Sequence, residues 1–133
     1  MTHNQKILFR ILFLLYLAGV LYLCFGRFEN TPSVEWSLLG IPTDKLVHFC
    51  MFFPFPILAF LAFDRYTDTT RQTLIFVGIT LVVGILLAMG TEWGQAHFTD
   101  YRSADPWDLV ADTSALVLSS LLVGIWDIRK QKK

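Results

Sequence analysis

The sequence is poor in the features that mark several common classes of soluble protein. It has only two cysteines, and they form neither a CxxC pair nor a Cys/His cluster with zinc-ligand spacing. The 11 basic and 11 acidic residues leave no net charge, so no basic excess indicates a nucleic-acid partner. The HExxH motif, the nucleophile elbow of serine hydrolases, internal repeats and low-complexity linkers are also missing. These absences argue against a zinc module, a nucleic-acid-binding domain and the common hydrolase classes.

Apolar residues, in contrast, are abundant: 54% of the chain is hydrophobic, and the mean hydropathy is +0.52. Four apolar runs approach the roughly 20 residues that a helix needs to cross a bilayer, at residues 7–25, 46–63, 74–93 and 106–126. Backbone amides inside lipid must bond within their own segment, so these runs predict helices. The sequence therefore predicts an all-α, polytopic membrane protein, a bundle of four transmembrane helices in a single domain over residues 1–133.

The Lys and Arg residues around these runs predict the direction of the chain, because cytoplasmic segments are enriched in them. Eight basic residues fall on the side of the two termini, against three on the opposite side, namely Arg27, Lys45 and Arg102. The acids have the reverse distribution, with three on the side of the termini and eight on the other. We therefore expect both termini in the cytoplasm (N-in/C-in) and an acidic outer face.

Two of the predicted spans have individual features. Lys6 and Arg10 precede the first run as in a secretory signal, but the run is too long and lacks small residues before Cys24, so cleavage there is only the alternative to a stable span. In the second run, Pro54 and Pro56 predict a kink, whose freed carbonyls a neighbouring helix must satisfy. Cys24 and Cys50 lie in apolar runs and are expected to act as small hydrophobes; whether they pair is left open.

Three patches of polar residues are predicted to meet at the outer face, because helical spacing brings the members of each patch together. They begin the second span, end the third and begin the fourth. The members are Asp44, Lys45 and His48; Glu92 and Gln95; and Arg102, Asp105, Asp108 and Asp112.

In the last patch, Asp105 and Asp108 have a structural explanation, whereas Asp112 does not. Asp105 before Pro106 is a good helix N-cap, and Asp108 lies in the first turn, where the helix dipole favours an acid. Asp112 lies seven residues after Asp105, about 10 Å along the helix axis, within an apolar run. An ionisable group at that depth is expensive unless it is paired, which makes it a functional candidate. Polar residues that simply hold helices together are the equally weighted alternative.

These residues resemble the signature of the VanZ-like family, small bacterial membrane proteins named after one associated with resistance to the glycopeptide antibiotic teicoplanin. The resemblance covers about residues 40–125 and rests on Asp44-Lys45-x-x-His48-Phe49, Glu92-x-x-Gln95, and Arg102 followed by Asp108 and Asp112. It implies that Asp44, Lys45, His48, Glu92, Gln95, Arg102, Asp108 and Asp112 form the polar site. It also implies a bacterial cytoplasmic membrane, but no defined activity.

Three functions compete for this site. The first is a binder that shields an envelope lipid or a lipid-linked cell-wall precursor, with Lys45 and Arg102 holding a phosphate or carboxylate. The second is a membrane-embedded hydrolase or transferase, in which His48 acts as a base oriented by Asp44 or Asp112, and Glu92 as an acid. The third, a proton or ion pathway, is disfavoured because the inner halves of the spans carry no acid or His. No cofactor is predicted, although His48, Glu92 and Asp112 could bind a divalent metal.

Overall fold

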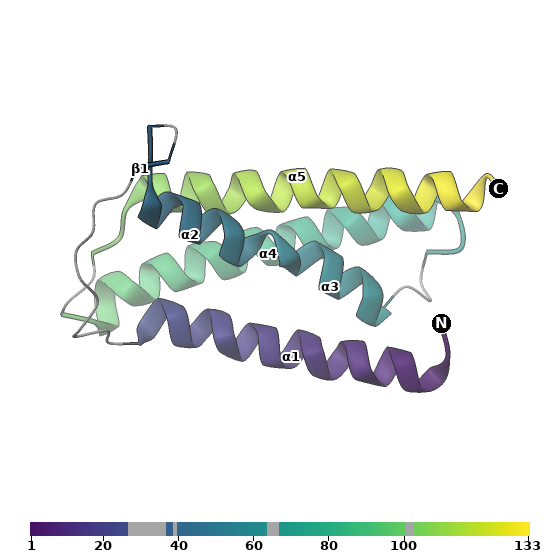
Figure 1. Cartoon of the computed structure of the whole chain (residues 1–133), viewed down its shortest axis with the longest axis horizontal. Helices are drawn as coiled ribbons and strands as arrows, with labels where there is room; N and C mark the ends of the chain where they lie inside the picture. Colours follow the sequence, from purple (N-terminus) through teal and green to yellow (C-terminus); the bar gives the residue numbers. More distant parts are fainter. Residues whose placement is uncertain (27–36, 39, 64–66, 101–102) are drawn as a thin grey trace.

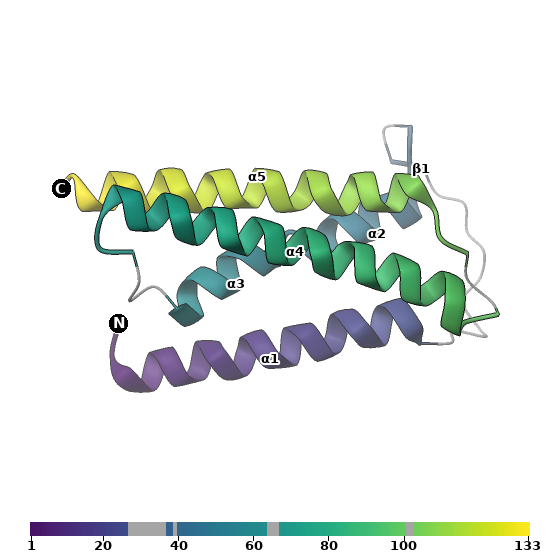
Figure 2. The ribbon, with the colours of Figure 1, turned by 180° about the vertical axis from the view of Figure 1, so that it is seen from behind.

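The chain folds into long helices that run side by side (Figures 1 and 2). The computed structural model describes residues 1–26, 37–38, 40–63, 67–100 and 103–133. Its helices are α1 (His3–Phe25), α2 (Thr43–Phe52), α3 (Pro54–Phe63), α4 (Thr70–Phe98) and α5 (Pro106–Gln131). Helices α2 and α3 together form one span, so four helical segments are long and apolar enough to cross a membrane. The predicted all-α architecture is confirmed at this level.

Some helices begin earlier or end later than the hydrophobic runs predict, whereas the boundaries at Phe25, Phe63 and Pro106 agree with the prediction. Thr2 caps α1 and Thr69 caps α4, each in a capping box with a glutamine three residues later, Gln5 and Gln72. Helix α4 continues to Phe98 and α5 to Gln131. Polar terminal turns therefore extend the helices beyond the apolar residues that hydropathy detects.

The second span is broken where its prolines predict. Helix α2 ends at Phe52, and α3 begins at Pro54, whose missing N–H costs nothing in a first turn. The hydroxyl of Tyr16 on α1 donates to the carbonyl of Met51 beside the break, over 2.6 Å. The neighbouring helix thus supplies a donor beside the break, although Met51 is not the residue four positions before either proline.

A short hairpin, which the sequence analysis did not predict, precedes α2. Strand β1 (Ser37–Leu38) pairs antiparallel with β2 (Ile41–Pro42). Gly40 turns the chain with a φ of 79°, a conformation that favours glycine. Residues 27–36 of the same connection lie outside the described residues.

The apolar core lies between the helices, and the outward faces are apolar as well. Phe52, Phe55, Ala88, Ala115 and Leu116 are buried at its centre. Many large hydrophobic side chains remain exposed along the length of α1, α4 and α5. Exposed apolar surface of this extent is typical of a protein whose solvent is lipid.

Candidate functional site

The three polar patches meet at one end of the bundle. The start of α2, the end of α4 and the start of α5 lie together there (Figures 1 and 2). They bring together Asp44, Lys45, His48, Glu92, Gln95, Asp105, Asp108 and Asp112. Arg102, the remaining predicted member, lies outside the described residues.

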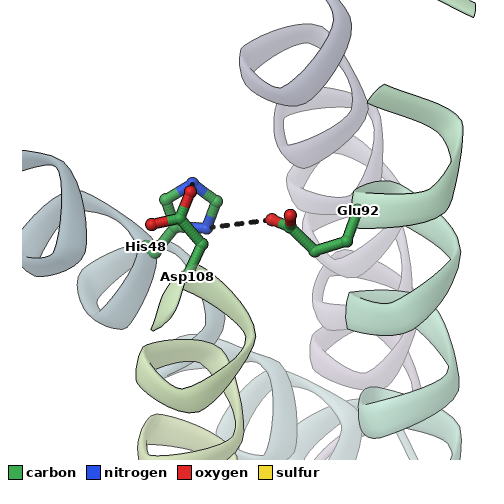
Figure 3. A group of neighbouring side chains, drawn as sticks. All are labelled: His48, Glu92 and Asp108. Atoms are coloured by element: carbon green, nitrogen blue, oxygen red, sulfur yellow. Dashed lines mark ion pairs between the residues drawn. The ribbon is translucent and has the colours of Figure 1, made fainter. Parts of the chain in front are cut away.

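The buried imidazole of His48 is the centre of this site. Its Nδ1 lies 3.0 Å from Oδ1 of Asp112, and its Nε2 lies 3.4 Å from Oδ2 of Asp108. Glu92 Oε1 lies 4.0 Å from Nδ1, along the dashed line in Figure 3. Three helices thus each place a carboxylate or imidazole at the same point, and Asp112 is entirely buried there.

Two buried carboxylate oxygens of this site accept no hydrogen bond from any residue that the structure describes. They are Glu92 Oε1 and Asp112 Oδ2. The other oxygen of Glu92, Oε2, accepts from the backbone N–H of Asp105 over 3.2 Å. A buried acceptor without a donor costs about 1–3 kcal/mol, so both oxygens are ready to accept a proton donor or a cation.

Lys45 forms a separate, saturated group beside His48. Its ammonium donates to Asp44 over 2.9 Å, to Asp108 over 2.5 Å and to Asp105. The pKa of the Asp105 carboxyl lies below its usual range, because the carboxylate accepts hydrogen bonds from Lys45 and from the backbone N–H of Trp107. Asp105 caps α5 as predicted, since Oδ1 accepts from the Trp107 N–H over 2.9 Å. Its second role, binding Lys45, was missed because it joins residues far apart in sequence.

Gln95 is more firmly engaged than the sequence suggests. Its side-chain amide donates to the carbonyl of Cys24 over 2.8 Å, which ties α4 to α1. Gln95 also contributes to the wall of a cavity of about 370 Å³, together with Asp44, Val47, His48, Ser103 and Asp108. Ser103 was not among the predicted site residues, because a lone serine in a connection carries no recognisable signal.

A second buried polar cluster lies at the opposite end of the bundle. Asp127 Oδ2 accepts from the Thr73 hydroxyl over 2.6 Å and from the Gln131 amide over 3.0 Å. The Gln131 amide also donates to the carbonyl of Thr67. This cluster joins α5 to α4 and to the connection that precedes α4. We call it the clasp, and its contacts indicate a structural role.

Two serines of α5 are buried but differ in their hydrogen bonds. The Ser119 hydroxyl bonds back to its own helix, donating to the Ala115 carbonyl over 2.8 Å. Ser120 Oγ is buried and bonds to no residue that the structure describes.

Comparison with known proteins gives one relative and no family assignment. The chain is 31% identical over 96 residues to a protein of Schizosaccharomyces pombe described as uncharacterized protein C11E3.10. The match covers 71% of this chain and 56% of the relative, so the chain spans little more than half of that protein's length. No protein-family model matches the sequence, and no solved structure matches it.

Proposed function

We propose that this chain is a VanZ-like membrane protein that binds the polar part of an envelope lipid or lipid-linked cell-wall precursor at the outer face of a bacterial cytoplasmic membrane. A role in resistance to glycopeptides such as teicoplanin would follow from shielding that precursor. The resemblance in residues 44–48, 92–95 and 102–112 supports the family, and four apolar helices support the membrane. Eight basic residues on the predicted side of the termini, against three on the other side, support the N-in/C-in orientation.

The pair of buried oxygens without donors carries this proposal. Glu92 Oε1 and Asp112 Oδ2 are acceptors that a bound ligand could satisfy. Neither residue lines the cavity of about 370 Å³, but His48, which both carboxylates approach, does. Sugar hydroxyls, amides and ammonium groups supply such donors. The polar part of a lipid-linked sugar or peptide therefore matches the chemistry of this site.

Lys45 already binds three carboxylates, so it is not free to bind the phosphate of a ligand as expected. A free lysine was expected to hold a phosphate, but Lys45 already donates to Asp44, Asp105 and Asp108. An incoming phosphate would have to compete with three carboxylates for one ammonium. The sugar or peptide portion of the ligand is therefore the better partner for the protein side chains.

A binding experiment on the purified chain in nanodiscs tests the proposal. The probes are a polyprenyl diphosphate carrying an N-acetylated amino sugar and, for comparison, phosphatidylglycerol without a sugar. We expect saturable binding of the sugar-bearing lipid, weakened at least about tenfold, or ~1.4 kcal/mol, by Glu92→Gln. Asp127→Asn, at the opposite end of the bundle, is the control that should keep binding. Equal binding of both lipids, or by wild type and Glu92→Gln, would contradict the proposal.

One observation favours catalysis as the second candidate. Asp112 lies 3.0 Å from Nδ1 of His48, an arrangement that orients an imidazole and leaves Nε2 for proton transfer. His48 also lines the cavity. Turnover of a lipid-linked sugar that disappears in folded His48→Ala and Glu92→Gln variants would support an enzyme. If the wild type shows no turnover, and the folded variants lose only ligand binding, the binding function is supported.

A further inference from the structure

Three side chains at the centre of the site are arranged as ligands of one ion. His48, Glu92 and Asp108 each offer one donor atom, and these atoms all lie within 4.8 Å of one another. They come from α2, α4 and α5, and Figure 3 shows the Glu92 carboxylate pointing toward the imidazole. The sequence suggested Asp112 as the second carboxylate, but the geometry gives that position to Asp108.

The burial of Glu92 indicates that something positive belongs beside it. Its side chain is 8% exposed, and Oε1 accepts no hydrogen bond from the described residues. A carboxylate is rarely buried unless it is paired or coordinates a metal. Its Oε1 lies 4.0 Å from Nδ1 of His48, which is too long for a hydrogen bond.

A neighbouring group of carboxylates shows the contrast. Asp44, Asp105 and Asp108 also lie within 4.8 Å of one another, but the ammonium of Lys45 binds all three. That group already holds its cation. In the part of the chain that the structure describes, no lysine or arginine lies within ion-pair distance of Glu92, and Lys45 reaches the group around His48 and Glu92 only through Asp108 Oδ1.

We propose that His48, Glu92 and Asp108 bind a divalent cation, with Asp112 as the residue that positions His48. The Nδ1–H of His48 would donate to Asp112, which leaves Nε2 for the metal, and such carboxylate–histidine pairs commonly orient metal ligands. Glu92 and Asp108 supply two carboxylate ligands, and Asp108 also binds Lys45 through its other oxygen. One imidazole and two carboxylates suit Mn²⁺ or Zn²⁺.

The separation of His48 and Asp108 fits this assignment. Two ligands of a tetrahedral Zn²⁺, each about 2.1 Å from the ion, lie about 3.4 Å apart. His48 Nε2 and Asp108 Oδ2 are 3.4 Å apart. Glu92 is the more distant ligand, with its donor oxygen within 4.8 Å of the other two donor atoms.

The cation deepens the proposed function, and its role in ligand binding rests on that function. The ion would supply the positive charge that Lys45 cannot, and an open coordination position would accept a phosphate oxygen of the lipid-linked precursor. Metal binding itself needs no lipid. The two proposals can therefore fail separately.

The test is metal binding by the purified full-length chain, without lipid-linked ligand. After chelation, Mn²⁺ is added, and the loss of the electron paramagnetic resonance signal of free Mn²⁺ measures binding; Zn²⁺ is added in competition. We expect one saturable site per chain and a rise in the thermal unfolding midpoint with either metal. Glu92→Gln should abolish saturable binding, and Asp112→Asn should weaken it by about 10–100-fold.

The stability of the metal-free variants separates this proposal from a merely structural role. Glu92→Gln removes an uncompensated carboxylate, so the metal-free variant should be at least as stable as metal-free wild type. Asp127→Asn removes an equally buried carboxylate outside the site and should retain the metal-dependent shift whatever its own stability. Wild type without saturable binding, or Glu92→Gln with wild-type binding, overturns the proposal. If Glu92→Gln does not fold, Asp108→Asn and the wild-type titration decide.

Loss of metal binding and loss of ligand binding have different meanings. The sugar-bearing lipid is titrated with and without chelator. Lipid binding in wild type that never binds Mn²⁺ or Zn²⁺ refutes the cation and leaves the proposed function standing. Metal binding without lipid binding refutes the proposed function and leaves the metal site.

Discussion

His48 Nδ1 lies 3.0 Å from Oδ1 of Asp112, a carboxylate with no exposed surface, and this contact joins α2 to α5 in the middle of the polar site. The pair both orients the imidazole and fixes the rotation of two helices. The depth of Asp112 in an apolar run is therefore explained by its partner on another helix.

Replacing Asp112 should separate these two roles. Asp112→Ala leaves a ring nitrogen without its partner and should lower the free energy of unfolding by about 1–3 kcal/mol. Asp112→Asn keeps an acceptor oxygen and should cost less. Thermal or detergent unfolding of the purified protein measures both. Wild-type stability of Asp112→Ala would show that the pair contributes nothing to helix packing.

Lys45 should stabilise the end of the bundle by neutralising three carboxylates. Lys45→Met leaves Asp44, Asp105 and Asp108 close together without a cation, and we expect a loss of about 1–3 kcal/mol, between surface and buried ion pairs. Adding Asp108→Asn should recover part of that loss. Asp44, with a side chain 60% exposed, should matter least. A double-mutant cycle that gives no coupling between positions 45 and 108 would contradict this account.

The sequence predicted the helices better than their ends or their side-chain partners. Hydrophobic runs show which residues lie in lipid, but Thr2 and Thr69 begin their helices earlier through capping boxes built from polar residues. Pro54 gave the break in the second span correctly, because proline acts through local backbone chemistry. The acceptor of the Tyr16 hydroxyl was not predictable, since it depends on how α1 lies against the break.

In the polar site too, the sequence predicted contacts between residues close in the chain and missed some contacts between residues far apart. Spacing along α2 correctly placed Asp44, Lys45 and His48 at one end of one helix. It did not reveal that Lys45 reaches Asp105, 60 positions away, or that Gln95 turns to the Cys24 carbonyl. Those contacts depend on the relative rotation of the helices, which apolar runs on all faces leave undetermined.

Gly84 should be required where α4 crosses α5. A Cβ at this position would lie 2.6 Å from Leu116 Cδ2 and 3.2 Å from Phe55 Cδ1, and Leu116 is completely buried. Gly84→Ala should therefore destabilise the protein by about 1–3 kcal/mol through overpacking. Gly78 and Gly90 have nothing within 4 Å of the same atom, so their alanine variants are matched controls. Equal unfolding midpoints for all three variants would contradict the close approach.

The clasp at the opposite end of the bundle should affect stability but not the polar site. Thr73→Val removes the hydroxyl that donates to Asp127 and should cost about 1–3 kcal/mol. Asp127 lies about 22 Å along α5 from Asp112, too far to touch His48. Ligand and Mn²⁺ titrations of folded Thr73→Val should therefore match wild type. A change in either titration would mean that the two ends of the bundle are coupled.

The orientation of the bundle is the prediction on which the proposed ligand depends. With Cys24 and Cys50 replaced by alanine, Ala104→Cys reports on the end that holds the site, and Lys132→Cys reports on the other end. In intact cells, a membrane-impermeant maleimide should label position 104 and should reach position 132 only after permeabilisation.

The reverse labelling pattern would place the site in the cytoplasm. The distribution of basic residues favours the outer face because the two ends differ by eight to three, and the acidic cluster itself contributes little to orientation. A cytoplasmic site could not reach a precursor displayed on the outer leaflet, so the shielding function would fail. The cation site would survive, since His48, Glu92 and Asp108 converge in the same way whichever side of the membrane they face.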